Sequence, residues 1–266
     1  MRSTWRCGLL TWHPLPRAGV SRRAQQAAVR APQLTPWQEA AALPFAALTA
    51  WRALEGCAGL GTGESLLVLG AGGAVGAAAV QLALSWGALP HVTCRPRSAA
   101  RLTALGALSA GDADAELTSE ALRLGWPRFD VVLDAVGSPA LEEAAAALLR
   151  PQGRLVTLHG GLVRALDARG VCLGPAAALA ELAGRRAELA TRHGVGRYSW
   201  AVMRQDGDAL GEIARLAGAG QLSSSVGRVL PLESAGEAQE LAASGEAGGK
   251  VVLDCSSPAA AEAPGS

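Results

Sequence analysis

SLLVLGAGGAVGAAAVQLA, residues 65–83, is the stretch of sequence that decides the fold of this chain. An apolar run of strand length passes through a glycine-rich turn into an Ala/Val/Leu segment with helical spacing. This order is typical of a nucleotide site, because glycines let the backbone approach a pyrophosphate and the first N–H groups of the helix supply unpaired donors. Glycines also serve ordinary turns, so the interpretation depends on the rest of the chain.

Composition excludes several classes of function. The chain has 266 residues, half of them hydrophobic, and a net charge of +1, which gives no electrostatic case for binding nucleic acid. Its five cysteines are scattered, without a CxxC motif or a histidine at ligand spacing, which predicts a reduced, intracellular protein without a metal site. The most apolar window, residues 74–90, is interrupted by polar residues and glycines and predicts a buried helix, so no transmembrane segment is expected.

The chain divides into four parts by composition. Residues 1–36 are rich in arginine, and the first acidic residue is Glu39, which is typical of a mitochondrial presequence. The alternative is a disordered N-terminus on a cytoplasmic protein. Residues 37–222 are expected to form a dinucleotide-binding domain with a helical lead-in broken at Pro44. Residues 223–255 are expected to form a smaller C-terminal lobe, and residues 256–266 a disordered tail.

Strands and helices alternate after the glycine turn. Strands are expected at 91–94, 129–134, 153–158, 229–232 and 249–253, and helices at 99–106, 141–149, 176–192, 208–217 and 235–243. This alternation predicts an α/β fold with a doubly wound parallel sheet and right-handed crossovers. A strand near 108–113 is poorly signalled. Asp130 and Asp134 share one strand, so capping and turn roles explain them better than a catalytic pair.

The end of the second strand indicates which cofactor binds. In a dinucleotide fold, the residues about 20 positions after the last glycine face the adenosine ribose. Cys94, Arg95 and Arg97 stand there without a carboxylate. Arginine accommodates a 2′-phosphate, so NADPH is favoured over NADH, although exposed arginines are common in so arginine-rich a chain.

Several motifs resemble one family, in order and at family spacing over residues 37–254. They are ALPFAALTA at 42–50, GAGGAVG at 70–76, FDVVLDAVG at 129–137, GRLVT at 153–157 and GKVVL at 249–253. Together they resemble the zinc-free quinone-oxidoreductase branch of the medium-chain dehydrogenase/reductase superfamily. RYSWA at 197–201 is most similar to the mitochondrial, reticulon-interacting members of that branch. The resemblance implies NADPH-dependent, zinc-independent reduction of a quinone-type acceptor linked to ubiquinone metabolism, a homodimer and a reticulon-type partner.

The resemblance also implies cofactor contacts, although it names no catalytic residue. Thr49 would lie behind the nicotinamide, Leu158 near its ribose, and Arg95 and Arg97 beside the 2′-phosphate. The pyrophosphate would contact the turn formed by Gly72, Gly73, Ala74 and Val75. Tyr198 and Trp200 would lie at the cleft, and the far wall of the site would be formed by Ala247, Gly248 and Lys250. Tyr198 and Trp200 have an alternative role as ordinary core aromatics.

Three departures from the family pattern leave a second function open. Ala74 adds a methyl group where the family has glycine, and Ala113 replaces a tyrosine expected to help hold the cofactor. The GroES-like catalytic domain of family members, roughly 100 residues or more, is expected to be incomplete here. The alternative is therefore a truncated, non-catalytic NADPH-binding or protein-interaction form, and a crystallin-like structural role is a third interpretation.

Overall fold

A computed structural model describes residues 37–202 and 204–255 of the chain. The predicted presequence at 1–36 and the predicted tail at 256–266 lie outside the described residues. Six parallel strands form the main sheet in the order β3-β2-β1-β4-β5-β6. Their bounds are β1 Ser65–Leu69, β2 Leu89–Cys94, β3 Ser109–Asp112, β4 Phe129–Asp134, β5 Leu149–Thr157 and β6 Arg197–Trp200. The predicted doubly wound α/β fold is confirmed.

The central strand β1 is apolar from Leu66 to Leu69 because both faces of the sheet are covered. Leu66 and Val68 of β1 belong to one hydrophobic cluster, and Leu67 and Leu69 to another, as alternation along a strand requires. The first cluster is covered by α2 Trp37–Trp51, η1 Arg52–Ala58, α3 Ala74–Ser85, α4 Pro96–Ala104 and α8 Gly207–Gly218. The second is covered by α5 Leu117–Arg123, α6 Pro139–Ala147 and the end of α7 Leu162–His193.

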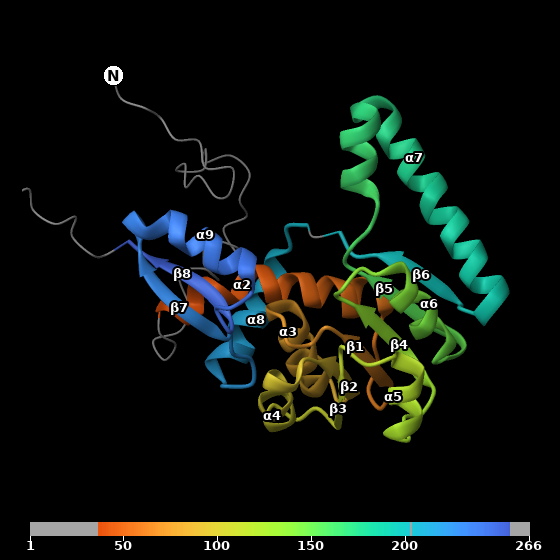
Figure 1. The fold of residues 1–266 in the computed structure, drawn as a ribbon, viewed down its shortest axis with the longest axis horizontal. Helices are drawn as coiled ribbons and strands as arrows, with labels where there is room; N and C mark the ends of the chain where they lie inside the picture. Colours follow the sequence, from red (N-terminus) through yellow and green to blue (C-terminus); the bar gives the residue numbers. More distant parts are fainter. Residues whose placement is uncertain (1–36, 203, 256–266) are drawn as a thin grey trace, which may run out of the picture.

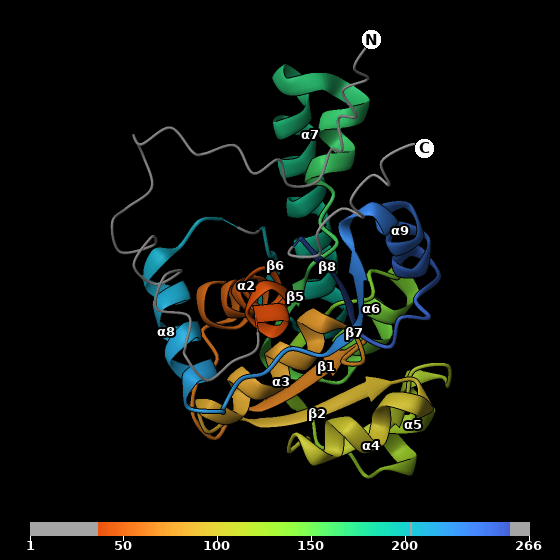
Figure 2. The same ribbon diagram turned by 90° about the vertical axis from the view of Figure 1, so that its left-hand side faces the viewer.

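A second, two-stranded parallel sheet lies beside the first. It consists of β7 Val226–Pro231 and β8 Lys250–Asp254, joined through the short η2 Leu232–Ser234 and α9 Ala235–Ser244. This unit lies against α2 at one end of the molecule, whereas α7 projects from the other end (Figure 1). Figure 2 shows the same arrangement turned by 90°, with the small unit beside α2. Val229 and Leu232 of the small unit remain exposed.

The structure corrects two expectations about helices. Pro44 does not break the lead-in: α2 runs through it, because Leu43, Ala46 and Ala47 beside it are buried, and this burial outweighs one lost backbone hydrogen bond. The helix predicted at 176–192 begins much earlier, at Leu162, and is interrupted at Gly170, whose φ of 70° and ψ of 177° are not helical. The poorly signalled strand is β3, and the other predicted strands and helices are present with shifted ends.

Candidate nucleotide-binding site

The turn from β1 to α3 is fixed by the neighbouring strand. Gly70 has a φ of +77°, in the region that favours glycine, and its N–H donates to Thr93 Oγ1 at 3.2 Å. The next residue, Ala71, donates its N–H to the carbonyl of Thr93 at 2.9 Å. Both bonds hold the turn against the end of β2, so the backbone of 70–73 faces outward at the carboxyl edge of the sheet.

The N-terminus of α3 offers donors at this edge. Helical hydrogen bonding in α3 begins with the N–H of Ala77, which donates to the carbonyl of Gly73 at 2.9 Å. The preceding N–H groups, including those of Ala74 and Val75, lie in the first turn, where helical geometry supplies no partner. Gly73 is the N-cap and is exposed, so no side chain of its own covers these donors. Together with the positive end of the helix dipole, this arrangement suits a pyrophosphate.

Close packing of α3 on β1 requires glycine at one position. A Cβ on Gly76 would lie 2.6 Å from Ala71 Cα and 2.8 Å from the Gly70 carbonyl oxygen. On the other side of the turn, a Cβ on Gly70 would lie 2.8 Å from Val136, which follows β4. Strand order reverses between β1 and β4, so the turn lies at the topological switch point where open α/β sheets bind ligands.

The predicted 2′-phosphate residues lie next to this turn. Arg95 is the exposed N-cap of α4, directly after β2, and Ser98 of the same segment would be 3.1 Å from a Cβ on Gly72. Arg97 is also exposed, and its guanidinium donates to the carbonyl of Gly245 at 3.2 Å. The structure therefore brings the arginines, the glycine turn and the connection from α9 to β8 together.

The other predicted contacts belong to α2, to β8 or to the residues next to β5 and β8. Leu158 directly follows β5, and Ala247 and Gly248 precede β8. Lys250 begins β8, with its Nζ 5.4 Å from the centre of the Phe45 ring, and burial lowers the pKa of its amine. Thr49 is buried in α2, where its hydroxyl donates to the Phe45 carbonyl at 2.7 Å. Thr49 and Lys250 therefore both contact Phe45, the first through the Phe45 carbonyl and the second through the Phe45 ring.

Tyr198 and Trp200 form a different cluster. Tyr198 is buried, and its hydroxyl donates to Glu142 Oε2 of α6 at 3.0 Å. Trp200 donates its indole N–H to the Tyr198 hydroxyl oxygen at 3.1 Å. Burial is the main cause that raises the pKa of Tyr198 above its ordinary value. The Tyr198 hydroxyl is therefore directed toward α6, whereas Trp200 packs against Gly160 in the loop after β5.

Asp134 organises the loops that follow β4 and β5. Its carboxylate is fully buried and accepts hydrogen bonds from the N–H groups of Val136 and Gly137, at 2.9 and 3.0 Å, and from Thr157 Oγ1, at 3.0 Å. The predicted turn role of Asp134 is confirmed. Asp130 instead joins β4 to β1, where its carboxylate accepts from the N–H and hydroxyl of Ser65 at 2.8 and 2.7 Å.

Sequence reasoning missed His159 at this edge. The residue is exposed, and its Nε2 lies 3.3 Å from the Ala135 carbonyl oxygen. A lone histidine two residues after a buried strand carries no signal of its own. Its position becomes visible only when β4 and β5 are seen to end side by side.

Comparison with known proteins shows that the chain is similar to dehydrogenases and oxidoreductases. The zinc-binding dehydrogenase family matches residues 105–253. NAD(P)H oxidoreductase RTN4IP1, mitochondrial, from Danio rerio is 32% identical over 221 residues, which cover 81% of this chain and 56% of that protein. The chain thus spans about half the length of this curated relative.

Solved structures agree with the fold. The crystal structure of an NAD-dependent alcohol dehydrogenase superposes with a TM-score of 0.68 and 28% identity, over 84% of this chain and 60% of that one. The quinone oxidoreductase from Coxiella burnetii superposes with a TM-score of 0.64 and 26% identity, over 84% and 62%.

The described residues do not provide a site for the ion that the family's description names. Within 37–202 and 204–255, no group of three or more His, Cys, Asp or Glu side chains is placed to hold a metal ion. Over the same residues, every helix is too short or too polar to cross a membrane.

Proposed function

This chain belongs to the zinc-binding dehydrogenase family of the medium-chain dehydrogenase/reductase superfamily, and on that premise we propose that it binds NADPH and delivers a hydride to a quinone-type acceptor. The observation that carries the proposal is the turn from Gly70 to Gly76, where the N–H groups of Ala74 and Val75 have no partner among the described residues and lie at the switch point of the sheet. A nucleotide coenzyme is the ligand whose chemistry matches this site.

Each part of the site has a defined task in this proposal. The N–H groups of Ala74 and Val75 would hold the pyrophosphate, and the Arg95 guanidinium would pair with the 2′-phosphate. The methyl group of Ala74 is half-buried at the first position of α3, where the backbone N–H is still available. Leu158, after β5, would cover the ribose at the reactive end. Bound NADPH supplies the hydride, and the protein orients it and excludes water.

The proposed class of electron acceptor and the proposed subcellular location rest on similarity to relatives. The Coxiella burnetii structure is titled a quinone oxidoreductase, and the Danio rerio relative is named mitochondrial. We propose the same acceptor class, without a zinc step, and a mitochondrial location for this chain. A fusion of residues 1–36 to a fluorescent protein tests the location: import into mitochondria supports it, and a diffuse cytoplasmic signal contradicts it.

Arg95 provides the sharpest test of cofactor choice. We expect Arg95→Ala to weaken NADPH binding about tenfold or more, because a charge-assisted contact to the 2′-phosphate is lost. The affinity for NADH should stay unchanged, since NADH carries a 2′-hydroxyl in place of the 2′-phosphate. Fluorescence titration of both cofactors measures the two affinities. Arg186→Ala, which removes an exposed arginine on α7, is the matched control and should alter neither.

Equal affinity of the unmodified chain for NADPH and NADH would contradict the role given to Arg95. Failure of both cofactors to bind would contradict the nucleotide site itself. Quinone-dependent oxidation of NADPH in the same sample tests the chemistry. Tight NADPH binding without turnover would favour the alternative, a nucleotide-binding protein that does not catalyse reduction.

A further inference from the structure

A cavity lies at the opposite edge of the sheet from the nucleotide turn. It has a volume of about 370 Å³ and is lined by Ala58, Gly59, Gln152, Arg154, Gly196 and Arg197. Arg154 and Arg197 are register partners on β5 and β6, three residues before Thr157 and Trp200 at the carboxyl edge. At roughly 3.3 Å per residue, the cavity lies about 10 Å along the strands from the proposed cofactor edge. It therefore is a separate site.

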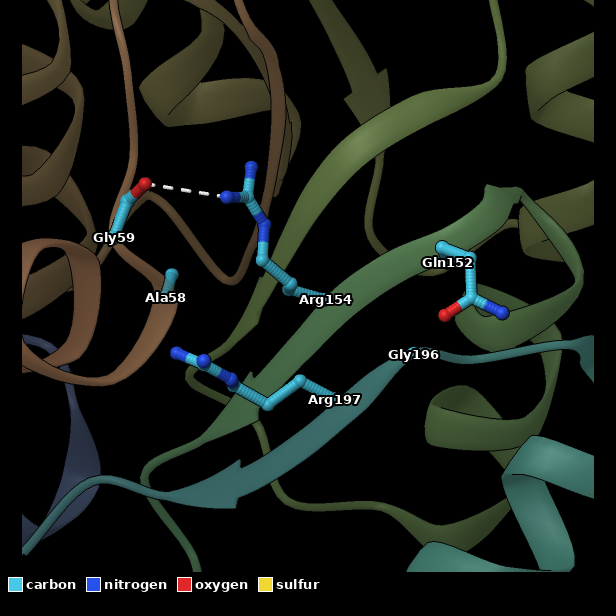
Figure 3. A pocket seen from close by; sticks show the side chains of 6 residues that line it. All are labelled: Ala58, Gly59, Gln152, Arg154, Gly196 and Arg197. Atoms are coloured by element: carbon cyan, nitrogen blue, oxygen red, sulfur yellow. Dashed lines mark hydrogen bonds between the residues drawn. The ribbon is translucent and has the colours of Figure 1, made fainter.

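Two guanidinium groups converge on this cavity from neighbouring strands. Figure 3 shows Arg154 and Arg197 both extending toward the end of η1 at Ala58 and Gly59. Arg154 donates to the Gly59 carbonyl at 3.2 Å, and Arg197 donates to the Cys57 carbonyl at 3.2 Å. Like charges at paired positions on adjacent strands are destabilising unless a counter-ion is present.

Of the two arginines, only Arg154 forms an ion pair with a carboxylate among the described residues. Glu64 Oε1 lies 2.5 Å from the Arg154 guanidinium. Among the described residues, no carboxylate forms an ion pair with Arg197, which is exposed at the start of β6. An anion from solution would complete the pairing.

The adjoining helix η1 contributes one arginine, Arg52, and one glutamate, Glu55. η1 is a π-helix, a rare form that occurs frequently at functional sites. The Nε of Arg52, its first residue, is buried without a hydrogen-bond partner in the described structure. Burial raises the pKa of the Cys57 thiol; Arg52, Arg197 and Arg204 lower it, and Glu55 raises it.

The backbone around the cavity is tightly held. Gln152 has a φ of 64°, a left-handed conformation that is costly for a residue other than glycine. Its N–H donates to the Gly194 carbonyl at 2.9 Å, and Gly196 donates to the Gly153 carbonyl at 2.9 Å. A Cβ on Gly196 would lie 2.7 Å from the Gln152 carbonyl oxygen, so the two strands meet here without side chains between them. The wall that carries Arg197 is therefore preorganised.

We propose that this cavity is a binding site for the phosphate group of a small metabolite, with Arg197 as its main ligand and Arg154 as its second. A phosphate carries several terminal oxygens and close to two negative charges, so it can engage two guanidinium groups that approach from different strands. A single carboxylate is matched by one guanidinium fork. The volume of the cavity leaves room for the organic part of the molecule.

Titration with inorganic phosphate, followed by ³¹P NMR line broadening on the full chain, tests the site. We expect Arg197→Gln to weaken binding about ten- to hundred-fold, which corresponds to the loss of a hydrogen bond to a charged group. Arg186→Ala is the matched control: it removes an exposed arginine on α7, outside both proposed sites, and should leave phosphate binding unchanged. NADPH titration of Arg197→Gln separates this proposal from the proposed function, because cofactor affinity at the other edge should stay unchanged.

Chemical modification supplies a second measurement that needs no variant. Phosphate should protect Arg197 from phenylglyoxal more than it protects the exposed Arg186, as read by mass spectrometry of the peptides. The proposal is overturned if Arg197→Gln binds phosphate as the unmodified chain does, if Arg186→Ala alone abolishes binding, or if phosphate leaves Arg197 as reactive as before.

Discussion

Gly76 sets the distance between α3 and β1, and thereby the shape of the nucleotide turn. Alanine at this position would bring its Cβ to 2.6 Å from Ala71 Cα and 2.8 Å from the Gly70 carbonyl oxygen. Both contacts are to backbone, which cannot rotate away as a side chain can. We expect Gly76→Ala to lower the free energy of unfolding by about 1–3 kcal/mol, as overpacking does, and to abolish NADPH binding.

Gly211 offers a matched control for this substitution. It lies inside α8, and a Cβ there would meet no atom within 4 Å. Gly211→Ala should therefore stabilise the protein by roughly 0.5–1 kcal/mol, because alanine favours the helix. Urea denaturation of both variants measures the two changes. If Gly76→Ala is as stable as Gly211→Ala and still binds NADPH, the close packing does not govern the turn.

Residues differ in how far their roles follow from sequence. The glycines of 70–76 were predictable because their task is local: the turn, the helix and the strand lie within one short stretch. The hydroxyl partner of Tyr198 was not predictable, because Glu142 lies 56 positions away and is brought near only by the fold. His159 escaped notice for the same reason, since its neighbour Ala135 belongs to another strand.

Among the elements, the short strand β3 depends on α5 for its place. Glu120 of α5 is 5% exposed, and its Oε1 accepts from the N–H of Asp112 at 2.8 Å. Arg123 donates to both oxygens of the same carboxylate, at 2.7 and 2.6 Å. These hydrogen bonds, with that from Arg123 first, lower the pKa of Glu120 from 4.5 to about 2. Glu120 thus ties β3 to the helix that follows it.

This coupling predicts a pH dependence with a defined sign. Because the folded-state pKa is depressed, the contribution to stability is present above pH 4.5 and is lost as pH falls toward 2. Glu120→Gln should lower the free energy of unfolding at pH 7 by about 1–3 kcal/mol and flatten its decline between pH 4.5 and 2. Urea denaturation at pH 7, 4.5 and 3 measures both effects.

The control is Glu237→Gln, which removes an exposed carboxylate on α9. It should leave stability within about 0.5 kcal/mol at every pH tested. An equally steep loss of stability on acidification in Glu120→Gln would show that the ion pair with Arg123 does not contribute to acid unfolding.

Helices and strands could be predicted from the sequence where their local signals agreed with the tertiary packing. Apolar runs bounded by turns predicted β1, β2, β4 and β5, whereas β3 was poorly signalled because its sequence, SAGD, is neither apolar nor alternating. The strand β6, the extension of α7 back to Leu162 and the π-helical form of η1 were not predicted. Continuation through Pro44 depends on burial of the flanking residues, which is a property of the assembled core.

At the scale of the whole molecule, one buried side chain joins the main sheet's helical layer to the connection that leads into the second sheet. Gln81 of α3 donates its amide to the Ser223 carbonyl at 3.1 Å and accepts from the Ser223 N–H at 2.9 Å. In the sequence, Gln81 only interrupts an apolar run. In the structure, it binds backbone 142 positions away. Its role depends on chain topology, and helical periodicity alone gives no sign of it.

Replacing Gln81 should therefore loosen the second sheet without unfolding the first. In Gln81→Met the volume is nearly kept, but both backbone groups of Ser223 lose their buried partners, which costs about 1–3 kcal/mol. We expect faster amide hydrogen exchange over residues 224–230 and unchanged exchange in β1 and β4. Gln221→Met, at an exposed position two residues before Ser223, should leave both regions as they are. Equal exchange in the two variants would mean that contacts of α2 with β7 and β8 hold the second sheet without help from Gln81. Faster exchange confined to 224–230 would instead identify Gln81 as the link between α3 and the C-terminal unit.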